Sequence, residues 1–270
     1  MAKISEHDRQ QYHERIKTFT TLVKVLLKNE KELLAETKKN APGAGLTKIN
    51  LVEEMLNLAS GYMAINGISV AILKVKNEES LNDARKSLYK AVIYLEEIVS
   101  NYIDSPFSDY EQKLQAIESF DANQRYRLIR KMGLAIDMLE QAYGDNSKWR
   151  WTFVEIEARF AVTAKNILDL RNVITNSSPQ SEFYESTVYH LRLIKELLTR
   201  AANRYRDKYE LSTQTMSDFK TGISFLAALR RLHIIMGEGE DAEEVKKKIS
   251  IWQTKHDTDM KRQEEAKKRL

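Results

Sequence analysis

The 270-residue chain has no cysteine, and this absence excludes several classes of site. Without a thiol there is no disulfide framework, no thiolate nucleophile, and no Cys-ligated zinc or iron–sulfur centre. Glycine and proline are scarce as well, at 9 and 3 residues. Their ordinary combined share is roughly 12% of a chain. Because sandwiches, barrels and βαβ arrays need many turn residues, this scarcity excludes them and favours an all-helical protein.

Long apolar runs are also lacking. Residues 1–8 contain no apolar stretch of the kind that a secretion signal needs. The apolar stretch at residues 68–73 is interrupted by Ser69, and no uninterrupted run approaches the roughly 18 residues of a membrane span. We therefore expect a cytoplasmic protein without a transmembrane segment.

Charge of one sign is not in excess. Lys and Arg number 43, Asp and Glu number 39, and the formal net charge is +4. The two signs are interleaved along the chain, whereas a nucleic-acid-binding protein usually concentrates its positive charge on one face. The sequence therefore leaves nucleic acid open as a partner without favouring it.

What the sequence does contain is apolar residues at helical spacing, with steps that alternate between three and four. Such stripes recur between short breaks along most of the chain, as in Leu81, Ala84, Leu88, Ala91, Leu95, Ile98 and Tyr102. Strict alternation of this kind favours long, nearly antiparallel helices. We predict an all-α fold: an elongated bundle or loosely solenoidal stack of seven to eight long antiparallel helices with a polar C-terminal helix.

The expected helices follow from these stripes and from the breaks between them. Ser105-Pro106 and Ser178-Pro179 place Ser at an expected N-cap and Pro at the first helical position. Asn66-Gly67 is turn-prone, so its helix is either one helix, two short ones or a hairpin. Asp121 can cap a new helix inside a longer one. The spans are residues 5–39, 48–75, 78–103, 107–143, 147–176, 179–210, 213–236 and 240–269.

The last helix differs from the others because most of its residues are polar. Its thin apolar stripe consists of Val245, Ile249, Trp252 and Met260. A helix this polar is held by one narrow contact or waits for a partner. We therefore expect two parts, an all-helical bundle domain over residues 1–239 and a partly detached C-terminal helix over residues 240–270, whose stripe is a candidate partner-binding surface.

The common catalytic and metal-binding patterns are missing. None of the five His residues has Glu three positions before it, as di-metal bundles require, and the zinc pattern His-Glu-x-x-His does not occur. The loop at residues 42–48 has the wrong order for a phosphate-binding loop, and Asp257-Thr258-Asp259 is not followed by the remaining ligands of a calcium loop. No Gly-x-Ser-x-Gly is present. We predict no catalytic residue, no cofactor and no metal.

Clusters of arginine are the main pattern that points to binding. Two segments resemble each other, Arg125-Tyr126-Arg127 and Arg204-Tyr205-Arg206. Arginine forks bind phosphate or carboxylate through two parallel hydrogen bonds. The candidate anion- or partner-binding residues are Arg125, Arg127, Arg130, Arg200, Arg204 and Arg206. The alternative is a solvated surface linked by ion pairs between neighbouring turns.

The sequence thus favours, by elimination, a non-enzymatic scaffold or adaptor that binds another protein through helical faces. The first alternative is an anion-recognising module for nucleic acid or for a phosphorylated or acidic peptide, built on the arginine clusters. An enzyme with carboxylates hidden from sequence and a role at a membrane surface remain further alternatives. The partner's identity is not specified, and the sequence leaves a homo-oligomer open.

Overall fold

The computed structural model describes residues 4–39, 43–144 and 148–268, with side chains to residue 265. Within these residues the chain forms ten α-helices and no strand, and eight of the helices are long. This confirms the predicted all-helical class and the long antiparallel helices. The gaps between the expected helices at residues 40–47 and 144–146 lie partly outside the described residues.

The chain divides into two compact units. Unit 1 comprises residues 1–100 and 111–150, and unit 2 comprises residues 101–110 and 151–270. The C-terminal helix belongs to unit 2. The sequence analysis, in contrast, treats residues 240–270 as a separate, partly detached part. The buried residues of the helix, Ala242 and Trp252, account for its grouping with unit 2.

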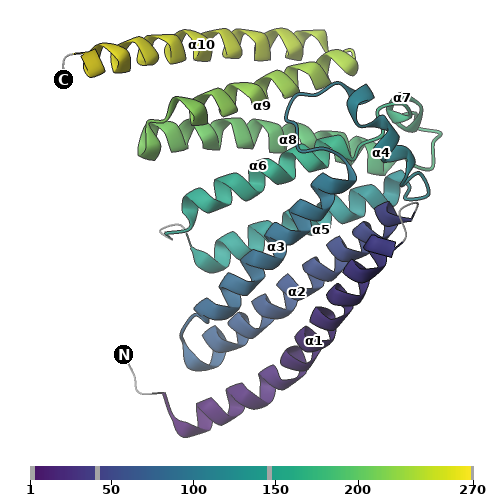
Figure 1. Ribbon diagram of the computed structural model, residues 1–270, viewed down its shortest axis with the longest axis vertical. Coiled ribbons are helices and arrows are strands. Elements are labelled where there is room, and N and C mark those ends of the chain that lie inside the picture. The colour runs from purple at the N-terminus through teal and green to yellow at the C-terminus, as the bar shows by residue number, and fades with distance from the viewer. Residues whose placement is uncertain (1–3, 40–42, 145–147, 269–270) are drawn as a thin grey trace. The chain divides into compact units, whose positions relative to one another are not determined.

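Unit 1 is built on three long helices, α1 (Glu6–Lys39), α2 (Ala44–Leu73) and α3 (Glu78–Ile98). α2 packs between α1 and α3, and α5 (Ala122–Tyr143) covers both α2 and α3 (Figure 1). The short α4 (Glu111–Gln115) precedes α5. Burial follows the predicted stripe, since Leu81, Ala84 and Leu88 on α3 are fully buried.

By length and composition alone, α2 would be able to cross a membrane. In the structure it is the central helix of unit 1 and contacts α1, α3 and α5. Val52 and Met55 are fully buried among these helices. A core helix that is apolar on several faces passes the same composition test as a membrane span, so the test does not distinguish the two.

Of the three alternatives at Asn66-Gly67, the single helix is the one that forms, because α2 continues through both residues. The buried Asn66 side chain accepts a hydrogen bond from the Asn77 backbone N–H at 2.9 Å. Asn77 in turn caps α3, because its side chain accepts from the Ser80 N–H. The polar residue that suggested a turn therefore holds the start of the next helix.

The helix expected over 107–143 is three elements, and one of its two breaks agrees with the sequence. Asp121 caps α5 in a reciprocal capping box with Gln124, as the alternative break predicted. The first part is instead the short 3₁₀ helix η1 (Phe107–Asp109) followed by α4. Pro106 precedes η1 and does not start a long helix, so that prediction was wrong.

Unit 2 contains α6 (Arg150–Asn166) from residue 151 onward, α7 (Val173–Asn176), α8 (Tyr184–Lys208), α9 (Met216–Ile235) and α10 (Gly239–Lys268). α9 packs between α8 and α10 (Figure 1). The helix expected over 147–176 ends at Asn166, and the helix expected to start at Pro179 starts at Tyr184. Consecutive turns occupy the segment around Pro179. The Ser181 N–H donates a hydrogen bond to the Ser178 carbonyl oxygen, and the Tyr184 N–H donates one to the Ser181 carbonyl oxygen.

Candidate functional site

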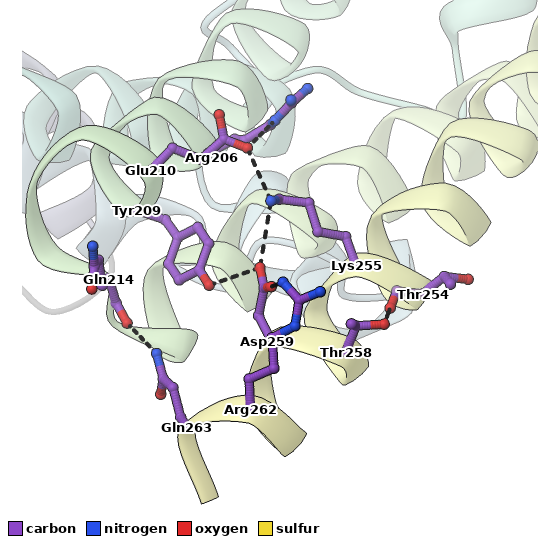
Figure 2. Close-up of polar contacts among 10 residues, drawn as sticks. All are labelled: Arg206, Tyr209, Glu210, Gln214, Thr254, Lys255, Thr258, Asp259, Arg262 and Gln263. Carbon is purple, nitrogen blue, oxygen red and sulfur yellow. Dashed lines mark hydrogen bonds and ion pairs between the residues drawn. The ribbon is translucent and has the colours of Figure 1, made fainter. Parts of the chain in front are cut away.

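A polar groove lies in unit 2 where the end of α8 meets α10. Its volume is about 390 Å³, and Figure 2 shows its walls. Between α8 and α9 the chain forms the single π-helical turn η2 (Tyr209–Thr213). The next residue, Gln214, has a left-handed backbone with φ of 48°. The groove is lined by Tyr209, Glu210, Gln214, Lys255, Asp259, Arg262 and Gln263.

Aromatic packing holds α10 in place beside the groove. The rings of Tyr209 and Phe219 are stacked, with centroids 4.9 Å apart, and Trp252 contacts Phe219 at 5.7 Å. Trp252 is buried. Gly222 allows the close approach, because a Cβ there would lie 3.0 Å from the Ala202 carbonyl oxygen and 3.3 Å from the Trp252 ring.

Asp259 is the polar centre of the groove. Its carboxylate accepts a hydrogen bond from the Tyr209 hydroxyl at 3.0 Å and pairs with Lys255 at 3.4 Å. Lys255 also reaches Glu210 at 3.7 Å. Burial, together with the hydrogen bond to Asp259, raises the pKa of Tyr209 to about 12. At neutral pH the tyrosine is therefore a hydroxyl donor that fixes the carboxylate (Figure 2).

The cations of the groove are more accessible than its carboxylates. The side chains of Arg262 and Lys255 are 77% and 43% exposed. The side chains of Glu210 and Asp259 are 30% and 19% exposed, and both are ion-paired. Both cations pair with Asp259, Lys255 at 3.4 Å and Arg262 at 3.9 Å, but they are the outer charges of the groove, and the group that they can bind is a carboxylate.

Two glutamines close the lower part of the groove. Gln263 donates a hydrogen bond to the Gln214 carbonyl oxygen at 3.0 Å, which joins α10 to the end of η2 (Figure 2). π-helical turns occur frequently at functional sites, and a left-handed non-glycine residue is a position of backbone strain. The groove thus combines an unusual backbone, accessible cations and fixed polar partners.

A second polar cluster lies at the turn between α9 and α10. His233 Nδ1 is 2.6 Å from Glu238 and 3.9 Å from Asp241, a grouping that is compatible with a metal ion. Lys195 contacts both oxygens of Glu238, at 2.5 and 2.6 Å. Burial tends to raise the pKa of Glu238, but Lys195 and His233 outweigh it and hold that pKa below its ordinary value. The ammonium of Lys195 already supplies the cation, so we assign no metal here.

The predicted arginines of unit 1 separate into one buried and two exposed residues. Arg125 is 5% exposed and donates to the carbonyl oxygens of Phe120 and Ile117 at 2.7 and 3.2 Å. It holds the turn before α5. Arg127 and Arg130 are exposed on α5.

The predicted arginines of unit 2 are drawn into ion pairs within their own unit. Arg204 and Arg200 pair with the buried Glu157 of α6 at 2.6 and 3.7 Å. Arg206 pairs with Glu210 at 3.0 Å and lies over the Trp252 ring at 5.4 Å. The two similar segments, Arg125-Tyr126-Arg127 and Arg204-Tyr205-Arg206, therefore lie in different structural surroundings.

The stripe expected on the C-terminal helix faces in part toward its own unit. Trp252 packs on Phe219 as described, and Val245 and Ile249 are half-buried. Met260 is 39% exposed. The sequence analysis missed the groove itself, although it considered Asp259 as part of a calcium pattern. The sequence offered two signs of it: the expected end of a helix at residue 210 and the polar helix expected over residues 240–269.

One family is identified by sequence comparison, because the model of the TP0443 family matches residues 8–260. The chain belongs to the TP0443 family. No curated protein and no solved structure matches it. In this TP0443-family chain the matched region includes Tyr209, Lys255 and Asp259, while Arg262 and Gln263 follow directly after it.

Proposed function

We propose that the protein is a non-enzymatic cytoplasmic adaptor that docks an acidic segment of a partner protein in the groove between η2 and α10. The observation that carries the proposal is that the cations of the groove, Arg262 and Lys255, are more exposed than the carboxylate of Asp259. Cations that already have a structural partner are held in place, and this lowers the conformational entropy lost when a carboxylate binds.

Apolar side chains beside the groove add contact area. Leu211, in η2, is 68% exposed, and Met260 follows Asp259 on α10. Binding energy at protein interfaces is concentrated in a few residues, and arginine is enriched among them. Arg262, the more exposed of the groove's two cations, is therefore the residue whose loss we expect to weaken docking most.

The alternative of an anion-binding surface made by the arginine clusters receives less support. Arg125 and Arg204 are engaged with groups of their own unit, and replacing them would disturb the fold. Arg127 and Arg130 are exposed and remain testable. The two hypotheses are distinguished by which substitutions abolish binding.

The test is the binding of a fluorescent polyglutamate peptide to the full-length chain, measured by anisotropy. The double variant Lys255→Glu with Arg262→Glu is expected to weaken binding at least about tenfold, which corresponds to about 1.4 kcal/mol. The matched control is Lys246→Glu with Lys247→Glu, which replaces two exposed lysines of the same helix and changes the net charge by the same amount. Equal binding by the double variant and the control would contradict the proposal, as would loss only in Arg127→Glu.

A further inference from the structure

α1 is the outer helix of unit 1, and several of its apolar residues face solvent (Figure 1). It packs on α2, and three of its apolar residues are buried. Leu22 and Val25, in contrast, are 44% and 51% exposed. Scattered apolar residues are common on protein surfaces, but two of them one turn apart on an outer helix form a face that another element can cover.

Leu22 and Val25 are the centre of a regular stripe along α1. Its members are separated by alternating steps of three and four residues, which is the spacing of a coiled-coil seam and keeps them on one face of the helix. This α1 stripe consists of Arg15, Thr18, Leu22, Val25, Asn29 and Glu32. Asn29 is half-buried, and the other five residues are exposed. The seam therefore lies on the surface of unit 1, within reach of a second helix.

The α1 stripe is complementary to itself when two copies run antiparallel. A twofold axis midway between residues 22 and 25 brings each position of one copy opposite the position equally far on the other side of the axis. Leu22 then faces Val25 of the second copy, and Thr18 faces Asn29 of the second copy. Every pair occurs twice, because both copies use the same surface. An apolar centre is thus flanked by a polar pair on each side.

The charges at the two ends of the α1 stripe fit the same register. Arg15 faces Glu32 of the second copy, so an ion pair lies on either side of the centre. Among the residues that the structure describes, none forms an ion pair with Arg15, and Glu32 has Lys28 at 3.5 Å in an exposed pair. In a parallel arrangement each charged residue would face the same residue of the other chain, and like charges would meet. The charge pattern therefore favours an antiparallel second copy.

We propose that two copies of this chain associate through antiparallel α1 helices, with the apolar residues at the centre and ion pairs between Arg15 and Glu32 on either side. The interface is small, because Leu22 and Val25 are the only apolar members of the stripe. Small interfaces are reversible, so we expect a dissociation constant of roughly 1–100 μM. The proposal concerns unit 1 alone and does not depend on the groove of unit 2.

The first experiment measures the mass of the full-length chain by sedimentation equilibrium, at concentrations from about 1 to about 300 μM. We expect the wild type to dimerise, together with the control Lys31→Glu, which changes an exposed residue of α1 outside the stripe. Arg15→Glu and Glu32→Arg should each weaken the dimer at least about tenfold, since each places like charges opposite one another.

A mixture of these two variants in equal amounts should dimerise again. Each charge of one variant then faces an opposite charge of the other, although each variant repels its own copies. Three results would overturn the proposal: a wild type that stays monomeric at the highest concentration, a dimer that Arg15→Glu leaves unchanged, and a mixture that stays monomeric.

The second experiment tests the orientation of the two helices. The native sequence has no cysteine, so introduced cysteines are the only thiols. In the variant that combines Thr18→Cys with Asn29→Cys, mild oxidation should link residue 18 of one copy to residue 29 of the other. The two positions are too far apart along one helix to be bridged within a chain. Peptide mass spectrometry identifies the link, and its absence, or links mainly between two residues 18, would contradict the antiparallel dimer.

Discussion

At the scale of single residues, buried charge is handled in two ways. Glu30 of α1 is 5% exposed and is met by Lys90 at 2.7 Å and by the Tyr94 hydroxyl at 3.3 Å. Lys165 is buried to a similar degree, and none of the residues that the structure describes forms an ion pair with it. A paired interior charge is tolerated because its partner offsets desolvation, whereas an unpaired one responds by changing its protonation state.

The buried carboxylate of Glu157 provides a direct test of this balance. Glu157→Ala leaves Arg204, whose side chain is 22% exposed, without its partner at 2.6 Å. We expect the free energy of unfolding to fall by about 3 kcal/mol, the usual loss when one member of a buried pair is removed. Urea unfolding measures the loss, and Glu155→Ala, an exposed neighbour on α6, is the control. Similar values for the two variants would show that the pair is not structural.

Lys165→Met should have the opposite effect. The unfolded chain keeps the lysine proton up to its ordinary pKa of 10.5, whereas in the folded chain the pKa is about 8. Below pH 8 the folded protein therefore carries a penalty, and wild-type stability rises as the pH increases from 8 to 10.5.

At pH 7 we expect Lys165→Met to raise the free energy of unfolding by about 2 kcal/mol. The advantage should shrink between pH 8 and pH 10. Thermal denaturation at pH 7 and pH 10 measures both effects, with Lys220→Met as the control. Destabilisation at pH 7 by the Met variant would mean that the buried amine makes a favourable contact.

At the scale of helices, two glycines differ in how closely a neighbouring helix approaches them. A Cβ on Gly222 would meet the Ala202 carbonyl oxygen at 3.0 Å, at the junction of α8, α9 and α10. A Cβ on Gly67 of α2 would meet nothing within 4 Å. The same substitution therefore has opposite consequences in the two helices.

Gly222→Ala is expected to lower stability by about 1–2 kcal/mol, because the added methyl group forces the helices apart. Gly67→Ala is expected to raise it by about 0.5–1 kcal/mol, since alanine favours a helix interior. Parallel urea titrations of the two variants decide the matter. If both variants were more stable than the wild type, the junction of α8, α9 and α10 would be able to accommodate the added methyl group, contrary to this prediction.

Helix class and core stripes were predictable because they depend on spacing along one element. Thr187, Leu191, Ile194 and Leu198 on α8 are buried as their three-four alternation indicates. The Asp121 start was also readable, since its capping partner lies three residues away. Local chemistry of this kind is contained in a short window of sequence.

What the sequence left open or did not indicate depends on contacts that lie outside a short window of sequence. Asn66 looks like a turn residue until the Asn77 N–H reaches it from the next helix. The groove escaped notice for the same reason, because Tyr209 and Asp259 are 50 positions apart. Arg125 and Arg204 carry the expected charge, but each binds a group of its own unit, the Phe120 carbonyl oxygen for Arg125 and the Glu157 carboxylate for Arg204.

At the scale of the whole molecule, most of the surface that we propose for docking belongs to the last helix. α10 is joined to α9 through Trp252, and its polar face carries Lys255, Asp259 and Arg262. Deleting the helix would expose Phe219 and disturb the fold of unit 2 together with any interaction. Point substitutions of exposed groove residues therefore separate binding from folding, which truncation does not.

The measurement that tests the adaptor proposal most directly is capture of partners from native cell lysate, with and without nuclease, by three forms of the full chain. These are the wild type, the double variant Lys255→Glu with Arg262→Glu, and the control Lys246→Glu with Lys247→Glu. The proposal predicts a stoichiometric protein partner with the wild type and the control, lost only from the double variant. Retention of that partner by the double variant, or recovery of nucleic acid alone when nuclease is omitted, would contradict it.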